Sequence, residues 1–510
     1  MSNPVRAGAA GYLVIRAALQ KLSRHTLVYS LAEQLSRLAG FLLLPLITDY
    51  LGEAEFGTRE LLATTIALLA QLAGVNVSAA MSRYYFDERT PAGRGSVIST
   101  SILAVAAAAG AVGGLALLSA GLWARVLPSN SPDLDLLLRI AFGIFVLQVV
   151  REVQNKALQT QERSVLYGSL AFSKLLVEIG LQILFLVGFG WGLAGLLWAV
   201  LAAEALFVAI TSAILLPSIG LSFSKPVFAG LFAYSLPLVP NGLLQFCLHS
   251  ADRYFVGSLG SDRALGLYAL AYKLGYLPNY VVLGPFLLIW YPFVFSLESD
   301  AKRREMIARL APIFMLFMTA ATLAVGLFAE PLVALAASRE SFHTAWTSVP
   351  VVAFGYWLWG LFQILQTGFY VTKATGHLPR LTAAAAIVNA FLNFTLIPAL
   401  GYFGAAVATA LTFAALCWST ERSVRATFEV AYPWARILAP AFAAAAALVA
   451  FHEWPLAGGA SRPWWSGAIA FVLWSFAAVP LAFTRDEKSA VLAWWRARAG
   501  GKGERNSTGA

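Results

Sequence analysis

The residues of this chain that could do chemistry are charged side chains inside apolar segments. Glu33 and Arg37 are four residues apart, so a helix places both on one face. Lys273 lies in another apolar segment, with no carboxylate three or four residues away. A charged side chain at mid-depth in a membrane costs about 2.5–3.5 kcal/mol. We expect Arg37 and Lys273 to bind phosphate, Arg37 through two hydrogen bonds, and Glu33 to hold Arg37 or exchange a proton. The alternative for Glu33 and Arg37 is a self-neutralised pair.

Other charged residues have a simpler structural explanation beside the functional one. Lys174 and Glu178 repeat the four-residue spacing, and we interpret them as a structural ion pair. Asp252 and Arg253 lie at the predicted outer end of a segment, where they form either a solvated pair or a binding and coupling pair. Arg83 lies at a predicted inner end, where topology alone explains a positive charge, yet a phosphate entering from that side meets it first.

Polar and proline residues recur at regular spacing in two further segments. Asn241, Gln245 and His249 follow one another every four residues, which places three hydrogen-bonding groups on one helical face. That face fits either contacts between helices or contacts with sugar hydroxyls. The prolines recur every seven residues and predict weak points for bending and gating at Pro278, Pro285 and Pro292.

The sequence contains no recognisable catalytic constellation. It has no phosphate-binding loop, no dinucleotide fingerprint and no cluster of His and Cys at metal-ligand spacing. Cys247 and Cys417 lie far apart in apolar segments and indicate neither a metal site nor a disulfide. We therefore expect a protein that is not an enzyme and that uses no cofactor and no metal.

The elements that position these residues must be membrane helices. The 510 residues are 59% hydrophobic and 12% charged, with a mean hydropathy of +0.71, which is too apolar for a protein in water. Residues 1–25 are basic and lack the apolar run of a cleavable signal peptide. Long apolar runs predict about fourteen membrane-spanning helices, centred on 26–48, 57–81, 96–119, 136–155, 165–187, 193–216, 228–250, 265–292, 309–328, 347–371, 380–398, 401–420, 434–451 and 467–484.

The distribution of positive charge predicts the topology. With both termini in the cytoplasm, twenty-six of the 36 Lys and Arg residues fall in inner segments and only seven at outer ends. The net charge of +10 is thus explained by topology, and we expect no nucleic-acid partner.

Short motifs occur twice along the chain. Tyr29-Ser-Leu returns at Tyr234, Leu51-Gly with Gly57 returns at Leu259-Gly with Gly266, and Gly192-Leu-Ala-Gly returns at Gly401, all 205 to 209 residues later. Both copies begin with a helix that runs outward, so they form parallel repeats. We predict an all-α membrane protein of two parallel six-helix lobes plus two C-terminal helices. Its parts are a basic segment 1–25, an N-lobe 26–216, a linker 217–227, a C-lobe 228–420, two helices in 421–484 and a cytoplasmic tail 485–510.

Several motifs resemble those of polysaccharide and O-antigen flippases of the Wzx type. The motifs are Leu51-Gly-Glu-Ala-Glu-Phe-Gly, Ser82-Arg-Tyr-Tyr, Asp252-Arg-Tyr-Phe-Val-Gly, Gly266-Leu-Tyr-Ala-Leu-Ala-Tyr-Lys, and Asn389 to Pro398 followed by Gly401-Tyr-Phe-Gly-Ala-Ala. The resemblance covers roughly residues 26–485. It implies the MATE-like fold of the superfamily that also holds multidrug exporters and lipid II flippases.

The resemblance also implies a cargo and a cellular setting. The cargo would be an undecaprenyl-diphosphate-linked oligosaccharide, moved from the inner to the outer leaflet of a bacterial cell membrane by alternating access. Membrane lipids, a polysaccharide polymerase and co-assembly machinery would be its partners. The expected site residues are Arg37, Lys273, Arg83 and Arg253 for phosphate, Asn241, Gln245 and His249 for sugar, and Glu33, Asp252, Pro278 and Pro285 for coupling and gating.

Two other functions fit parts of the sequence. A MATE-like cation or drug antiporter of the same fold would need a cavity lined by carboxylates and aromatic residues. A membrane-embedded glycan polymerase or ligase would need an acidic catalytic pair, for which Asp49, Glu53 and Glu55 are the candidates.

Overall fold

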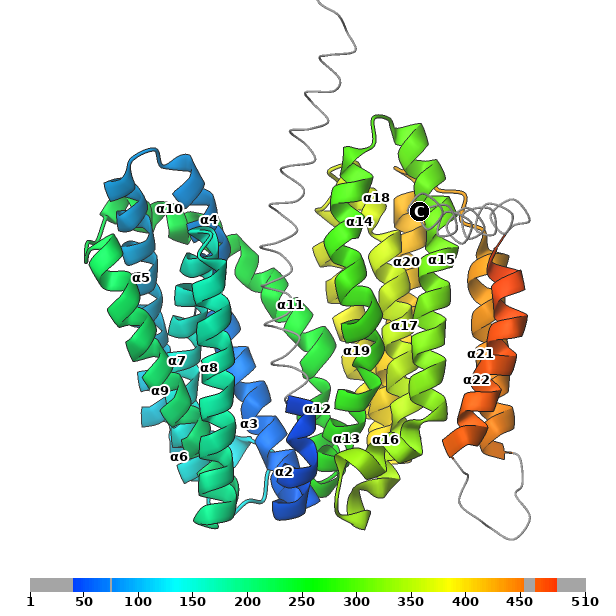
Figure 1. The fold of residues 1–510 in the computed structure, drawn as a ribbon, viewed down its shortest axis with the longest axis horizontal. Coiled ribbons are helices and arrows are strands. Elements are labelled where there is room, and N and C mark those ends of the chain that lie inside the picture. The colour runs from blue at the N-terminus through cyan, green and yellow to red at the C-terminus, as the bar shows by residue number, and fades with distance from the viewer. Residues whose placement is uncertain (1–39, 74–75, 454–463, 484–510) are drawn as a thin grey trace, which may run out of the picture. The chain divides into compact units, whose positions relative to one another are not determined.

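The structure is a computed structural model that describes residues 40–73, 76–453 and 464–483 (Figure 1). Within these ranges the chain is helical and contains no strand. It divides into two compact units. The first contains the described residues up to Ala269 together with Leu335–Phe342, and the second contains Leu270–Ala334 and the described residues from His343 onward.

The helices of the first unit are mostly long and apolar, with short breaks at Gly and Pro. They are α2 (Leu44–Tyr50), α3 (Glu53–Leu72), α4 (Val77–Asp87), α5 (Pro91–Leu118), α6 (Ala120–Val126), α7 (Leu134–Thr160), α8 (Ser164–Ile183), the π-helix η1 (Leu184–Gly188), α9 (Gly192–Ile219), α10 (Lys225–Ser235), the 3-10 helix η2 (Leu236–Leu238), α11 (Val239–Ser250) and α12 (Asp252–Leu259).

Helix α13 (Asp262–Gly275) begins in the first unit and ends in the second. The elements that follow are the π-helix η3 (Asn279–Leu283), α14 (Gly284–Ser296), α15 (Asp300–Leu327), α16 (Ala329–Ala336), the 3-10 helix η4 (Glu340–Ser348), α17 (Val349–Leu365), α18 (Thr367–Val371), α19 (His377–Leu400), α20 (Tyr402–Arg425), α21 (Trp434–Glu453) and α22 (Trp464–Ala482).

The prediction of an all-helical membrane protein is confirmed. Twelve helical stretches among the described residues are long and apolar enough to cross a membrane. The predicted span 26–48 lies largely outside the described residues. The predicted span 136–155 lies in α7, which is long enough but carries Asp135, Arg139, Arg151, Glu152 and Lys156. The count of fourteen spans and the lobe boundaries therefore stay predictions.

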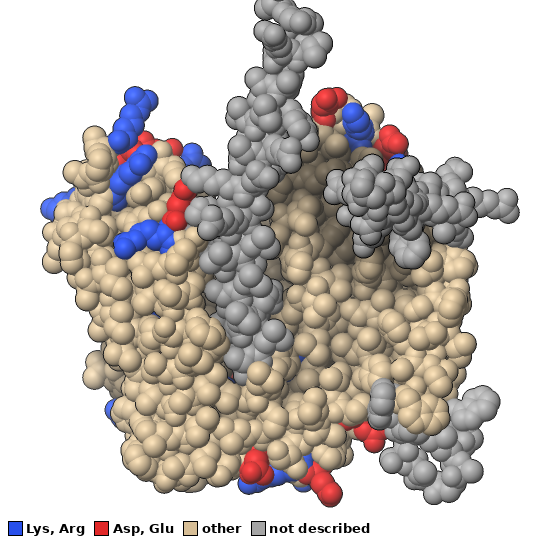
Figure 2. Space-filling view, viewed as in Figure 1, with Lys and Arg blue, Asp and Glu red and all other residues tan. Residues whose placement is uncertain are grey.

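Charged side chains lie near the helix ends on the face shown in Figure 2, and the surface between them is uncharged. Exposed apolar side chains such as Leu118, Phe172 and Phe317 are normal for helices whose outer faces meet lipid tails. Charged residues within the spans are consequently the ones that require a partner inside the protein.

Two of the duplicated glycines pack against each other within the first unit. A Cβ atom on Gly57 of α3 would lie 2.8 Å from the backbone nitrogen of Gly266 and 2.1 Å from the carbonyl oxygen of Asp262. A Cβ atom on Gly266 of α13 would lie 1.9 Å from the carbonyl oxygen of Glu53. Only glycine permits this backbone contact, so the paired landmarks in the sequence mark one helix crossing.

The same end of the first unit includes a segment from far along the chain. Arg339 donates from Nε to the carbonyl of Asp49 at 3.0 Å, and Ser338 donates from Oγ to the carbonyl of Pro45 at 3.0 Å. The carbonyl of Asp49 belongs to the last turn of α2, where backbone acceptors have no partner within the helix, whereas the carbonyl of Pro45 lies in the first turn. The side chain of Arg339 therefore caps the end of α2, and Ser338 adds a contact near its start.

The core of the second unit joins the last two helices to α15. Leu316, Leu323 and Leu327 of α15 pack with Ala444 of α21 and with Trp474, Ala478 and Ala482 of α22. The indole of Trp474 donates to the carbonyl of Pro440 at 3.0 Å. Helices α21 and α22 thus form a packed part of this unit.

Candidate functional site

The first charged cluster joins α3 to the junction of α11 and α12. Arg253 donates from Nη1 to Asp252 Oδ1 at 2.8 Å and to the carbonyl of His249 at 2.8 Å. Its Nε lies 3.5 Å from Glu60 Oε1 on α3. The side chains of Arg253, Asp252 and Glu60 are only 8%, 3% and 13% exposed. Their charges are therefore neutralised by direct contact, as a low-dielectric interior requires.

Two tyrosines extend this cluster. The hydroxyl of Tyr268, a fully buried residue of α13, donates to Asp252 Oδ2. The hydroxyl of Tyr254 lies 3.0 Å from Thr65 Oγ1 on α3. Asp252 thus accepts hydrogen bonds on both oxygens, and α12 is held between α3 and α13 by polar contacts.

A second charged cluster lies between α7, α8 and α9. Glu204, the one carboxylate of α9, is fully buried. It accepts from Arg151 Nε at 2.5 Å and Nη2 at 3.2 Å, and its Oε1 lies 3.1 Å from Lys174 Nζ. Lys174 also contacts Glu178, which accepts from Gln182 at 3.1 Å. The pairing of Lys174 with Glu178 agrees with the spacing in the sequence. The contacts of Glu204 with Lys174 and Arg151 were not predicted.

Arg59 of α3 connects the two clusters electrostatically. It interacts with Glu60 of the first cluster and with Glu178 of the second. We call the eight charged residues the charged network: Arg59, Glu60, Arg151, Lys174, Glu178, Glu204, Asp252 and Arg253. It contains four cations and four carboxylates, so its net charge is zero. Among the described residues no group of three His, Cys, Asp or Glu side chains could hold a metal ion.

The predicted sugar-contacting residues all lie on α11. Asn241 is exposed, and Gln245 and His249 are half-buried. Helix α11 packs against α3, where the side-chain oxygen of Gln71 lies 2.4 Å from the position that a Cβ atom on Gly242 would take. His249 contributes its backbone carbonyl to Arg253. Their role in binding sugar stays a prediction.

The second unit contains the predicted residues Lys273, Pro278 and Pro285. Lys273 is half-buried near the end of α13, beside Tyr272, whose hydroxyl contacts that of Tyr356. Pro278 immediately precedes the π-helix η3, and Pro285 lies in the first turn of α14. The helix is therefore irregular between these two prolines. The gating role of this break and the binding of phosphate by Lys273 stay predictions.

The remaining predicted residues are Arg83, which the structure describes, and Glu33 and Arg37, which it does not. Arg83 is exposed near the end of α4, with Nε 3.9 Å from Asp87 Oδ2 and its guanidinium 5.7 Å from the ring centre of Tyr234. Glu33 and Arg37 lie outside the described residues.

Sequence reasoning missed Glu60 and Glu204 as members of this site. A local signal existed for Glu204, because it is an isolated carboxylate in the middle of a 28-residue apolar helix. A carboxylate at that depth requires a cation from another helix. Its partners, however, are 53 and 30 residues away in sequence, so spacing on one helix could not identify them.

The fold of the chain is similar to that of several solved transport proteins. The lipid II flippase MurJ in an inward closed conformation matches with a TM-score of 0.71 at 12% identity, over 89% of this chain and 98% of that one. An inward-facing MATE multidrug resistance transporter of the MOP superfamily matches with a TM-score of 0.63 at 16% identity, over 78% and 93%. A MOP superfamily transporter from Pyrococcus furiosus matches with a TM-score of 0.58 at 16% identity, over 80% and 95%.

No curated protein matches the chain in sequence. A family model does match, over residues 22–298, and its description is polysaccharide biosynthesis protein. That range includes the whole charged network and more than half of the chain. The protein is a multi-pass membrane protein with the MOP fold, and it belongs to the polysaccharide biosynthesis protein family.

Proposed function

We propose that this protein is a flippase that moves an undecaprenyl-diphosphate-linked oligosaccharide from the inner to the outer leaflet of the bacterial cell membrane. The observation that carries the proposal is membership of the polysaccharide biosynthesis family by a chain with the fold of a lipid II flippase. The product would enter surface polysaccharide, either O-antigen or exopolysaccharide. Both termini would be cytoplasmic, and a polysaccharide polymerase with its assembly partners would use the flipped lipid.

The binding roles follow from charge. Because the charged network is neutral and its cations already have carboxylate partners, it gives no excess charge to a diphosphate. We assign phosphate contact to cations outside the network, namely Arg37, Lys273 and Arg83. Asn241, Gln245 and His249 would contact sugar hydroxyls.

Arg253 has a different proposed role from the other cations. Its guanidinium contacts Asp252, Glu60 and the carbonyl of His249 in this conformation. The longest of these contacts is the one to Glu60, at 3.5 Å. We propose that phosphate competes with Glu60 for Arg253, which would break one of the contacts between α12 and α3, while Asp252 and Glu33 take part in coupling.

The membrane potential favours the outward direction. Moving one elementary charge across 100 mV changes the free energy by about 2.3 kcal/mol. Two negative charges that leave an inside-negative cell therefore gain about 4–5 kcal/mol. Bending at the break between Pro278 and Pro285 would let the protein change from a form open to the inside to a form open to the outside.

Contacts in the structure weigh against a polymerase or ligase. Of the three acidic candidates, Glu53 lies 3.7 Å from Arg263, and Glu55 accepts the backbone N–H of Gly52 at 3.1 Å as a cap of α3. The carbonyl of Asp49 accepts from Arg339. The carboxylates of Glu53 and Glu55 thus have structural contacts, whereas the contact of Asp49 is made by its backbone carbonyl. A cation antiporter is less favoured because carboxylates of the network are matched one for one by cations.

The test uses purified full-length protein in liposomes with a fluorescent undecaprenyl-diphosphate oligosaccharide. We expect the wild type to expose the lipid to an added membrane-impermeant enzyme, and the double variant Arg37→Ala, Lys273→Ala to lose most of that activity. A matched control is Arg139→Ala, which removes a cation that is 52% exposed and paired with Asp135 on the surface of α7.

Two outcomes would contradict the proposal. Wild-type protein that moves no lipid-linked oligosaccharide, while it transports an organic cation, would favour the antiporter. Full lipid movement by the double variant at normal protein levels would remove Arg37 and Lys273 from the phosphate site.

A further inference from the structure

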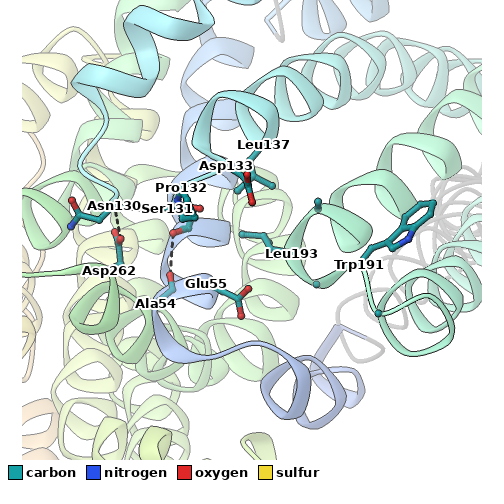
Figure 3. A pocket seen from close by; sticks show the side chains of 14 residues that line it. Ala54, Glu55, Asn130, Ser131, Pro132, Asp133, Leu137, Trp191, Leu193 and Asp262 are labelled. Atoms are coloured by element: carbon teal, nitrogen blue, oxygen red, sulfur yellow. Dashed lines mark hydrogen bonds between the residues drawn. The ribbon is translucent and has the colours of Figure 1, made fainter.

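A pocket of about 470 Å³ lies at the end of the first unit where α3 and α9 begin (Figure 3). Its walls come from the first turns of α3, the loop between α6 and α7, the turn before α9 and the start of α13. The polar lining includes Glu55, Asn130, Ser131, Asp133 and Asp262. The topology predicted from positive charge places this end outside the cell. None of these residues belongs to the charged network.

Two of the pocket's carboxylates, those of Asp262 and Glu55, are held by the backbone. Asp262 is 8% exposed, and its Oδ2 accepts from the backbone N–H of Asn130 at 2.8 Å, as the dashed line in Figure 3 marks. Its buried Oδ1 has no hydrogen-bond partner among the described residues. Glu55 Oε2 caps Gly52, and its Oε1 lies 3.8 Å from the position of a Cβ atom on Gly192. The pocket therefore offers acceptors that are already fixed in place.

The turn before α9 leaves room beside Glu55. Gly192 has a φ of +55°, which favours glycine, and it has no side chain to fill the space beside Glu55. Leu137, Leu193 and Pro132 form the apolar part of the lining. A binding site with a few fixed polar groups on an apolar wall has the usual design of a small-molecule pocket, whose typical volume is roughly 300–1,000 Å³.

The charge and positions of the hydrogen-bond acceptors in the pocket indicate the chemical class of its ligand. The lining has three carboxylates, Glu55, Asp133 and Asp262, and no Lys or Arg. These carboxylates do not converge as a metal site would, since no such group of three occurs among the described residues. A ligand with several hydroxyl or ammonium donors spread over its surface fits this arrangement, whereas a ligand with its own carboxylate would be repelled.

We propose that this pocket binds a neutral or amino sugar of the carried oligosaccharide on the outer side of the membrane. The inference rests on the proposed function, because the cargo supplies the sugar. Hydroxyl or ammonium groups of the sugar donate to Glu55, Asp133 and Asp262, and its apolar face lies on Leu193. The pocket thereby selects against acidic sugars and holds the glycan as it leaves the first unit.

The experiment measures sugar binding directly, by saturation-transfer NMR on full-length protein in lipid nanodiscs. The probes are glucosamine, N-acetylglucosamine and glucuronic acid. We expect saturation transfer to the first two sugars and at least fivefold less to glucuronic acid. Asp133→Asn and Glu55→Gln should each weaken glucosamine binding severalfold. Asp133 is exposed and its side chain makes no cap hydrogen bond to α7, so its replacement should fold normally.

Asp135→Asn is the matched control. Asp135 is two residues away, pairs with Arg139 at 2.8 Å and does not line the pocket. The Asp135→Asn variant should bind the sugars as the wild type does. Equal transfer to all three probes, or wild-type binding by both Asp133→Asn and Glu55→Gln, would overturn the assignment.

Lipid movement by the same preparations separates this inference from the proposed function. Wild-type protein that moves lipid-linked oligosaccharide but binds none of the sugars overturns the pocket and leaves the flippase standing. Wild-type protein that binds the sugars through Asp133 but moves no lipid supports the pocket and overturns the flippase.

Discussion

Replacing Glu204, the one charged residue of α9, with Gln should destabilise the first unit. Gln has the shape of Glu, so the change creates no cavity and removes only the negative charge. Glu204 is fully buried and binds Arg151 at 2.5 Å and Lys174 at 3.1 Å. After the change, Lys174 still has Glu178, but Arg151 loses its carboxylate partner.

The size of the effect follows from the exposure of Arg151. Breaking a buried ion pair by removing one partner costs about 3–5 kcal/mol. The Arg151 side chain is 25% exposed and can recover part of its hydration, so we expect the lower end of that range, about 3 kcal/mol. For a unit of this size, that loss lowers the melting temperature by roughly 5 °C.

Thermal unfolding of detergent-solubilised protein, followed by tryptophan fluorescence, measures this effect. The control Asp135→Asn breaks a pair whose side chains are about half exposed, which should cost less than about 1 kcal/mol. Adding Arg151→Gln to Glu204→Gln removes the unpaired charge and should restore part of the lost stability. The reasoning is refuted if Glu204→Gln melts together with the wild type and Asp135→Asn.

Two further changes test the packing at the other end of the first unit. Gly266→Ala places a Cβ atom 1.9 Å from the carbonyl oxygen of Glu53, so α3 and α13 must separate, at a cost of about 1–3 kcal/mol in thermal unfolding. Gly110→Ala, with no atom within 4 Å, is its control and should not destabilise; equal melting of both variants would contradict the crossing. Tyr268→Phe removes a hydrogen bond from the buried carboxylate of Asp252 and should cost about 1–3 kcal/mol. An unchanged melting temperature for Tyr268→Phe would show that Arg253 alone satisfies Asp252.

The repeat shows which structural features a sequence pattern can predict by itself. Gly192 and Gly401 have left-handed φ values of +55° and +62°, and the glycines three residues later, Gly195 and Gly404, have no room for a side chain. Each repeated motif therefore places a left-handed glycine at the start of a helix in its own unit. Such turns depend on local backbone geometry, which is why single residue types reveal them in a sequence.

The contacts of the charged side chains could be predicted only in part, for a physical reason. Lys174 and Glu178 were paired correctly because four residues on one helix bring two side chains together. The contact of Arg253 with Glu60, 193 residues earlier in the chain, was not predicted. No spacing along one helix encodes such a contact, since it depends on how α12 is rotated against α3.

The sequence by itself determined that the protein lies in a lipid bilayer, that it is helical and that its chain contains a repeat. Long apolar runs indicate a protein surrounded by lipid, in which the backbone must form helices. The repeated glycines stand where the backbone turns tightly or where two helices cross closely. Tertiary structure alone decided which charges meet. The partners of Glu204 and Arg253 come from other helices, because a buried ion takes the nearest opposite charge in space, whatever its distance along the chain.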